Sequence, residues 1–202
     1  IDPNIGIVDV IDERLDQLTK LSSSKKKIYT NITFVDIAGL VKGASKGEGL
    51  GNKFLSHIRE VDAIIHLVRC FESDKITHVN SKINPVDDLE TIKTEIILSD
   101  LDIIQKKLEK GKKKLLGEKE IKILEDKLKQ LNDGKEVIVN DKAEEKFLTT
   151  LGLLSIKPKI IVCNVDEESL PKGNSFTESV KNNYSEEKVV TICADIEDQI
   201  MG

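Results

Sequence analysis

Short apolar runs rich in β-branched residues alternate with longer amphipathic patterns along this chain, and this alternation constrains the fold more than any other feature. The runs lie at 6–10, 32–35, 62–71, 160–163 and 189–193. A near-continuous apolar run such as Asp62–Phe71 (DAIIHLVRCF) is typical of a strand buried on both faces of a sheet. Because helical patterns separate the runs, we predict an α/β fold built on a parallel sheet.

The segment from about Pro85 to Lys157 has a different pattern. Apolar residues recur there at alternating spacings of three and four, at Ile97, Leu101, Ile104 and Leu108 and again at Ile121, Leu124, Leu128 and Leu131. This spacing is typical of coiled-coil seams. Gly111 and Gly117 lie between the seams and suit a turn, so we predict an inserted antiparallel helical hairpin. The expected division is a sheet domain at 1–84 and 158–202, interrupted by the hairpin at 85–157.

Composition limits the classes of function. Hydrophobic residues make up 39% of the 202 residues, which is enough to form a core, and the formal net charge of -5 gives no general attraction to nucleic acid. Cys70, Cys163 and Cys193 lie far apart in apolar runs, which favours buried thiols in a reducing compartment over disulfides or a zinc site. No run is long enough to span a membrane, so we expect a soluble, cytoplasmic protein without a membrane partner. We also expect a monomer and no DNA partner.

The first strand-terminal motif is D-x-x-G, at Asp36–Gly39. In nucleotide switches the Asp of this motif reaches a magnesium ion, usually through water, and the Gly places a backbone N–H near the γ-phosphate. The motif is common, and a strand followed by an ordinary Asx turn is the alternative. The next segment, Leu40–Asn52, has four glycines within nine residues, which suits a loop that orders around a γ-phosphate.

Leu40 directly follows this motif, at a position where many switch GTPases have a Gln that orients the attacking water. A leucine side chain has no group that can orient a water molecule. Either another residue orients the water, or hydrolysis is slow.

A second strand end carries Asn164-Val165-Asp166-Glu167. In an N-x-x-D motif at such a place, the Asn holds the loop and the Asp accepts hydrogen bonds from two N–H groups of guanine. Here Glu occupies the fourth position and Asp166 lies one place too early. One alternative is that Glu167 accepts hydrogen bonds from guanine, with its longer side chain in a different plane from that of Asp. The other is that the site no longer selects guanine and admits adenine. A polar turn without a binding role is the alternative.

In this order, the segments resemble the Obg-like ATPases, the YchF branch of the Obg family of P-loop switch proteins. The similar stretches are FVDIAGLVKGASKGEGLGNKFLSHIRE at 34–60, its continuation to residue 92, and KPKIIVCNVDE at 157–167. The resemblance implies a Ras-like P-loop NTPase sheet with a coiled-coil insertion. It also implies ATP hydrolysis with Mg²⁺, with GTP as a second candidate substrate, and a ribosome-associated role in translation or stress.

The resemblance assigns two groups of site residues. On the phosphate side, Asp36 would hold magnesium, Gly39 would meet the γ-phosphate, Leu40 would be the hydrophobic replacement of the catalytic Gln, and His78 would position water. A solvent-exposed loop histidine is the alternative for His78. On the base side, the adenine pocket would be lined or backed by Asn164, Val165, Glu167, Cys193 and Ala194.

The resemblance does not extend to the family's ends. The family carries a GxxxxGK[ST] phosphate loop upstream and a TGS domain downstream, whereas this chain opens at Ile1-Asp2-Pro3-Asn4 and contains neither. We therefore expect a fragment that is inactive as written. The alternative function is a pseudo-NTPase or interaction module that binds the ribosome or its RNA through the hairpin without hydrolysis. Its lysines between 106 and 114 form either an RNA-binding tip or a solvated helix end.

Overall fold

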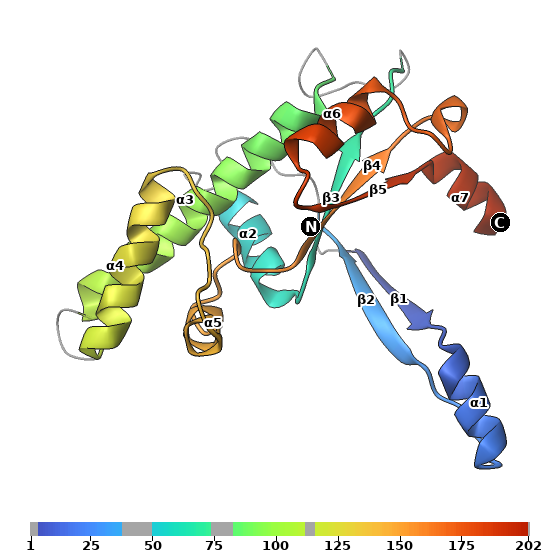
Figure 1. The fold of residues 1–202 in the computed structure, drawn as a ribbon, viewed down its shortest axis with the longest axis horizontal. Helices are drawn as coiled ribbons and strands as arrows, with labels where there is room; N and C mark the ends of the chain where they lie inside the picture. The colour runs from blue at the N-terminus through green and yellow to red at the C-terminus, as the bar shows by residue number, and fades with distance from the viewer. Residues whose placement is uncertain (1–3, 38–49, 74–82, 112–115, 202) are drawn as a thin grey trace. The chain divides into compact units, whose positions relative to one another are not determined.

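The computed structural model describes residues 4–37, 50–73, 83–111 and 116–201 (Figure 1). The chain divides into two compact units, Ile1–Gly39 and Leu40–Gly202. Each unit contains its own sheet, one with two strands and one with three among the described residues. The boundaries predicted at 84/85 and 157/158 fall inside the second unit and stay predictions.

The first unit is an antiparallel strand pair with one helix. β1 (Asn4–Val10) pairs with β2 (Thr30–Asp36), and the register places Val10 opposite Thr30. α1 (Glu13–Leu21) lies between these two neighbouring strand ends, so it belongs to a hairpin connection rather than a crossover. The expectation of a parallel sheet is therefore wrong for this strand pair, because the helical segment returns the chain directly beside the strand that it left.

The second unit contains the predicted parallel sheet. β3 (Ile64–Arg69), β4 (Lys159–Asn164) and β5 (Lys188–Ile192) form it in the order β3-β4-β5. α2 (Leu50–Glu60) precedes β3, α6 (Ser175–Asn183) connects β4 to β5, and α7 (Ala194–Met201) follows β5. This alternation of strands and helices confirms the α/β prediction for this unit.

One face of this sheet packs into a core with α3 (Pro85–Gly111) and α6. The buried residues of this core are Val68, Cys70, Leu89, Ile161, Cys163, Val165, Val180 and Cys193. All three cysteines are free and buried, as predicted. The opposite face is covered less, because Ile65 and Leu67 of β3 are 50% and 62% exposed. The prediction that this strand is buried on both faces is therefore wrong: within an apolar run, only contacts from distant segments decide which face is covered.

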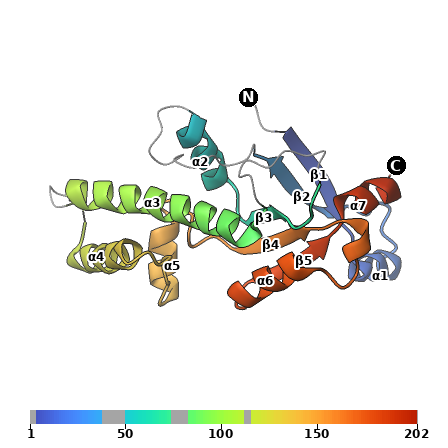
Figure 2. The same ribbon diagram turned by 90° about the horizontal axis from the view of Figure 1, so that it is seen from above.

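Two helices carry the predicted apolar seams. α3 (Pro85–Gly111) and α4 (Glu118–Asn132) lie side by side in both Figure 1 and Figure 2. Residues of both seams meet in one cluster, with Ile97, Ile104, Leu108, Leu124 and Leu131 buried. α5 (Lys142–Thr149) contributes Leu148 to the same cluster. The seams therefore supply the apolar surface on which this part of the chain packs.

Buried charged groups attach α3 and α4 to later segments. The buried Asp100 carboxylate of α3 accepts the backbone N–H groups of Leu154 and Ser155, each at 2.8 Å, and the Ser155 hydroxyl at 2.6 Å. The buried Lys127 Nζ of α4 lies 2.6 Å from the Glu144 Oε1 of α5. Removing Asp100 would leave its buried donors without this acceptor, which is costly. Removing Glu144 would leave the buried Lys127 with only the Asp126 carboxylate, 3.0 Å from its Nζ, as an anionic partner among the described residues.

His66 of β3 is a partly buried titratable group in this sheet. Its Nε2 is buried and has no hydrogen-bond partner among the described residues. Burial, reinforced by the positive charge of Lys159, lowers the pKa of His66 from its ordinary value of 6.5 to about 4. The folded protein therefore holds this imidazole in its neutral form.

We predict that His66 makes the protein less stable as the pH falls from about 6.5 toward 4. In that interval the unfolded chain binds a proton at this position and the folded chain does not, so the free energy of unfolding decreases. The loss attributable to His66 is on the order of 1–3 kcal/mol. Urea denaturation at several pH values should show a flatter profile for His66→Leu than for the wild type. Identical profiles would contradict the prediction.

Candidate functional site

The candidate site lies at the carboxyl ends of β4 and β5, which meet at one edge of the sheet because the strands are parallel. Asn164 is the last residue of β4, and its register partner Ile192 is the last residue of β5. Cys193 and Ala194 follow β5 immediately, and α7 begins at Ala194. The topology thus brings together the base-side residues that the sequence predicted.

Asn164 joins three strand ends through hydrogen bonds. Its side-chain Oδ1 accepts the backbone N–H of Ala194 at 2.9 Å. Its backbone carbonyl accepts the N–H of Cys70, just beyond β3, at 2.8 Å. The next residue, Val165, donates its N–H to the carbonyl of Ile192 at 2.8 Å. The Ala194 N–H is one of the groups that a helix leaves unpaired at its start, so this side chain also anchors the first turn of α7.

The turn after β4 separates the roles of its two neighbouring acids. The Asp166 side chain accepts the N–H of Ser169 at 3.0 Å and caps the short 3₁₀ turn η1 (Glu167–Ser169). Glu167 opens that turn with an exposed carboxylate. Its Oε1 accepts a hydrogen bond from Gln199 Nε2 of α7 at 3.4 Å. The acid at the fourth motif position is therefore presented at the surface, while the earlier acid serves the turn.

The side chains of Val165 and Cys193 are buried in the sheet core, and only their backbones border the site. Behind them, Cys70 and Cys163 share a thiol hydrogen bond. That bond, together with burial, raises the pKa of Cys70, and the same bond lowers the pKa of Cys163. These cysteines belong to the support of the strand ends rather than to their exposed surface.

Asn174 is a supporting residue that no strand-end motif in the sequence indicates. Its Nδ2 donates to the carbonyl of Cys70 at 2.7 Å and to the Ser169 hydroxyl at 3.1 Å. Its Oδ1 accepts the N–H groups of Phe176 and Thr177 at the start of α6. The signal was present, because Asn followed three residues later by Thr177 is close to a capping-box pattern. Asn174 thus ties the β3 end, the η1 turn and α6 together.

The phosphate-side residues are only partly described. Asp36 ends β2 in the first unit and is exposed. Gly39, Leu40 and His78 lie outside the described residues. Within the described ranges, no group of three or more His, Cys, Asp or Glu side chains gathers where it could hold a metal ion. The structure therefore brings the proposed base-side residues to one edge of the sheet, and the binding roles of both the base-side and the phosphate-side residues stay predictions.

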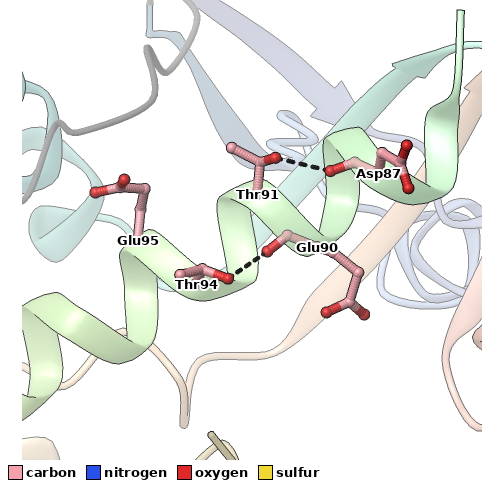
Figure 3. Close-up of a pocket in the computed structure, with 5 residues that line it drawn as sticks. All are labelled: Asp87, Glu90, Thr91, Thr94 and Glu95. Carbon is pink, nitrogen blue, oxygen red and sulfur yellow. Dashed lines mark hydrogen bonds between the residues drawn. The ribbon is translucent and has the colours of Figure 1, made fainter.

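A separate surface hollow lies along the first half of α3 (Figure 3). Its described lining residues are Asp87, Glu90, Thr91, Thr94 and Glu95. Thr91 and Thr94 donate their hydroxyl protons to the helix carbonyls of Asp87 and Glu90, each at 2.8 Å. Carboxylates repel phosphates, and the threonine donors are already used, so this hollow does not suit a nucleotide.

Comparison with known proteins identifies relatives of the whole chain. Residues 9–100 match the family described as 50S ribosome-binding GTPase. The ribosome-binding ATPase YchF of Bacillus subtilis is 44% identical over 213 residues, covering 99% of this chain and 58% of the relative. The YchF protein of Escherichia coli O157:H7 is also 44% identical, covering 99% of this chain and 57% of the relative.

A solved structure of a protein with the same name as these relatives has a similar fold. The YchF GTPase of Schizosaccharomyces pombe superimposes with a TM-score of 0.80 at 32% identity, covering 98% of this chain and 57% of the other. The chain thus spans somewhat more than half the length of the relatives it matches. Among the helices that the structure describes, none is long and apolar enough to cross a membrane.

We predict that Asn164→Ala loosens the junction of β4 and α7. The substitution leaves the Ala194 N–H without its acceptor, which should lower the free energy of unfolding by about 1–2 kcal/mol. Chemical denaturation would measure this loss. Asn183→Ala is a matched control, because the Asn183 side chain only donates to the Ser179 carbonyl at an exposed place on α6. If both substitutions lower the free energy of unfolding equally, the side-chain bond of Asn164 stabilises the protein no more than an exposed helix bond does, which would contradict the prediction.

Proposed function

Because this chain belongs to the YchF branch of the Obg family, we propose that it is part of a nucleotide-dependent switch that hydrolyses ATP and acts at the ribosome. GTP is the second candidate substrate. The observation that carries the proposal is the junction at Asn164, which holds two strand ends beside an exposed Glu167 carboxylate. Residues 34–60 supply the accompanying phosphate-side motif.

On the base side, Glu167 would accept a hydrogen bond from the exocyclic amine of adenine. Asn164 would hold the loop, since its side chain is already committed to the Ala194 N–H. Val165 and Cys193 would contribute backbone only, because their side chains are buried. Ala194 is exposed at the start of α7, where a small side chain leaves room for a flat base. With these roles, a motif with Glu in place of Asp would still provide a binding site for the base.

On the phosphate side, Asp36 would hold Mg²⁺. A single exposed carboxylate at a strand end suits this ion, which keeps several waters and takes few protein ligands. The ion would neutralise charge on the phosphates during hydrolysis. Gly39 would donate its backbone N–H to the γ-phosphate, and His78 would orient the attacking water that Leu40 is unable to hold. With an apolar residue at this place, we expect slow turnover.

The α3–α4 pair would form the antiparallel coiled-coil hairpin of the family, at 85–157 between the two parts of the nucleotide domain at 1–84 and 158–202. The meeting of both seams in one apolar cluster supports this proposal. A stiff hairpin that projects from a nucleotide domain suits contact with a large partner, and the ribosome named for the relatives is the partner that we propose.

Nucleotide binding by the full-length protein tests the base site. We predict that Glu167→Ala weakens ATP binding about tenfold, because the carboxylate acceptor for adenine is lost. Glu168→Ala removes the neighbouring exposed acid and should leave the affinity unchanged. Titration calorimetry with ATP and Mg²⁺ measures both variants. A protein that clearly prefers GTP, or a Glu167→Ala variant with wild-type ATP affinity, would overturn the assigned role.

The second candidate function is a binding module that contacts ribosomal RNA through the hairpin without hydrolysis. The basic residues near the α3 end favour it, although Lys106 is paired with Asp102 at 2.7 Å and acidic residues are interspersed. The presence of GxxxxGK[ST] in the coding sequence upstream of Ile1 would favour the hydrolase, and a degenerate loop would favour the module.

We predict that reversing Lys107, Lys110 and Lys112 to Glu reduces co-sedimentation with ribosomes, because phosphate contacts depend on positive charge. Reversing Lys25 and Lys26, in the polar connection after α1, together with Lys20 is a charge-matched control that should keep wild-type binding. The difference from the wild type should be smaller at high salt, because salt screens the contacts between lysines and phosphates. Unchanged sedimentation of the hairpin variant would remove the proposed RNA contact.

A further inference from the structure

Gln199 of α7 is the described side chain that touches the Glu167 carboxylate. Its Nε2 donates to Glu167 Oε1 at 3.4 Å, across 32 positions of sequence. Both side chains are exposed, and they come from the segments that follow neighbouring strands. The contact therefore connects the two sides of the proposed base site at its open edge.

The two segments are held firmly enough for this contact to orient the carboxylate. Glu167 lies in a turn that Asp166 caps. α7 is anchored at its start by the bond from Ala194 to Asn164. Gln199 lies five residues after that anchor, within the second turn of the helix. The positions of both groups are thus set by the strand-end junction.

Guanine and adenine offer different numbers of hydrogen-bond donors to a carboxylate such as that of Glu167. Guanine offers two neighbouring donors, N1–H and the 2-amino group, which match the two oxygens of one carboxylate. Adenine offers only its 6-amino group on that edge, next to the N1 acceptor. A carboxylate with both oxygens turned to the base therefore favours guanine. A carboxylate with one oxygen held elsewhere loses one of its two bonds to guanine but keeps the single bond that adenine can make.

We propose that Gln199 is a positioning residue that holds Oε1 of Glu167 away from the base, leaves Oε2 as the acceptor, and thereby disfavours guanine. The inference rests on the proposed function, since it needs Glu167 to face the base. It adds a residue outside the N-x-x-E motif to the determinants of nucleotide choice. Because the bond is long and exposed, the expected effect is modest.

The ratio of ATP to GTP affinity in the full-length protein tests this role. We expect Gln199→Ala to lower that ratio by about three- to tenfold, mainly through tighter GTP binding, because one surface hydrogen bond is worth about that much. Asp198→Ala removes an exposed neighbour on the same helix and should leave the ratio unchanged. In a Glu167→Ala background, which removes the acceptor of the Gln199 hydrogen bond, Gln199→Ala should have no further effect on the ratio.

The outcomes separate the two levels of the proposal. An unchanged ratio in Gln199→Ala, or an equal loss of affinity for both nucleotides, would overturn the role of Gln199 and leave the switch function standing. A shift of the same size in the Glu167→Ala background would show that Gln199 does not act through Glu167 and would also overturn it. A wild-type protein that binds neither ATP nor GTP would overturn the proposed function and this inference together.

Discussion

The hydrogen bond from the Ala194 N–H to Asn164 Oδ1 is the contact on which the candidate site depends. Parallel strands meet at one edge, but nothing in a strand ladder itself controls the loops beyond that edge. Asn164 supplies this control, because its backbone carbonyl binds the Cys70 amide while its side chain binds the start of α7. Glu167 and Gln199 then face each other across a junction whose sides are both anchored.

The sheet of the second unit and the helical seams were predictable because their signals are local. A buried parallel strand needs a continuous apolar run, and a helix pair needs apolar residues at spacings of three and four. Val68, Ile161 and Cys163 lie in such runs, and Ile104 and Leu124 lie in such seams; all five are buried. The proximity of the proposed base-side residues was also predictable, since an Asn at the end of a strand and the residues after a neighbouring parallel strand share an edge.

The features that the sequence did not reveal depend on contacts between distant segments. The antiparallel pairing of β1 with β2 follows from where α1 returns the chain, and the exposed face of Ile65 and Leu67 depends on what packs above β3. Asp166 and Glu167 are chemically similar acids, and only the cap to Ser169 separates their roles. Gln199 and Glu167 are 32 positions apart in the sequence, so no local spacing predicts their contact.

The central claim is that a nucleotide base binds at the ends of β4 and β5. Amide hydrogen exchange of the full-length protein, with and without saturating ATP and Mg²⁺, tests it most directly. A base seated there should slow exchange in peptides that cover 164–168 and 193–199, because a bound ligand suppresses local opening of these segments. Slower exchange elsewhere, with both of these segments unchanged while ATP is bound, would contradict the claim.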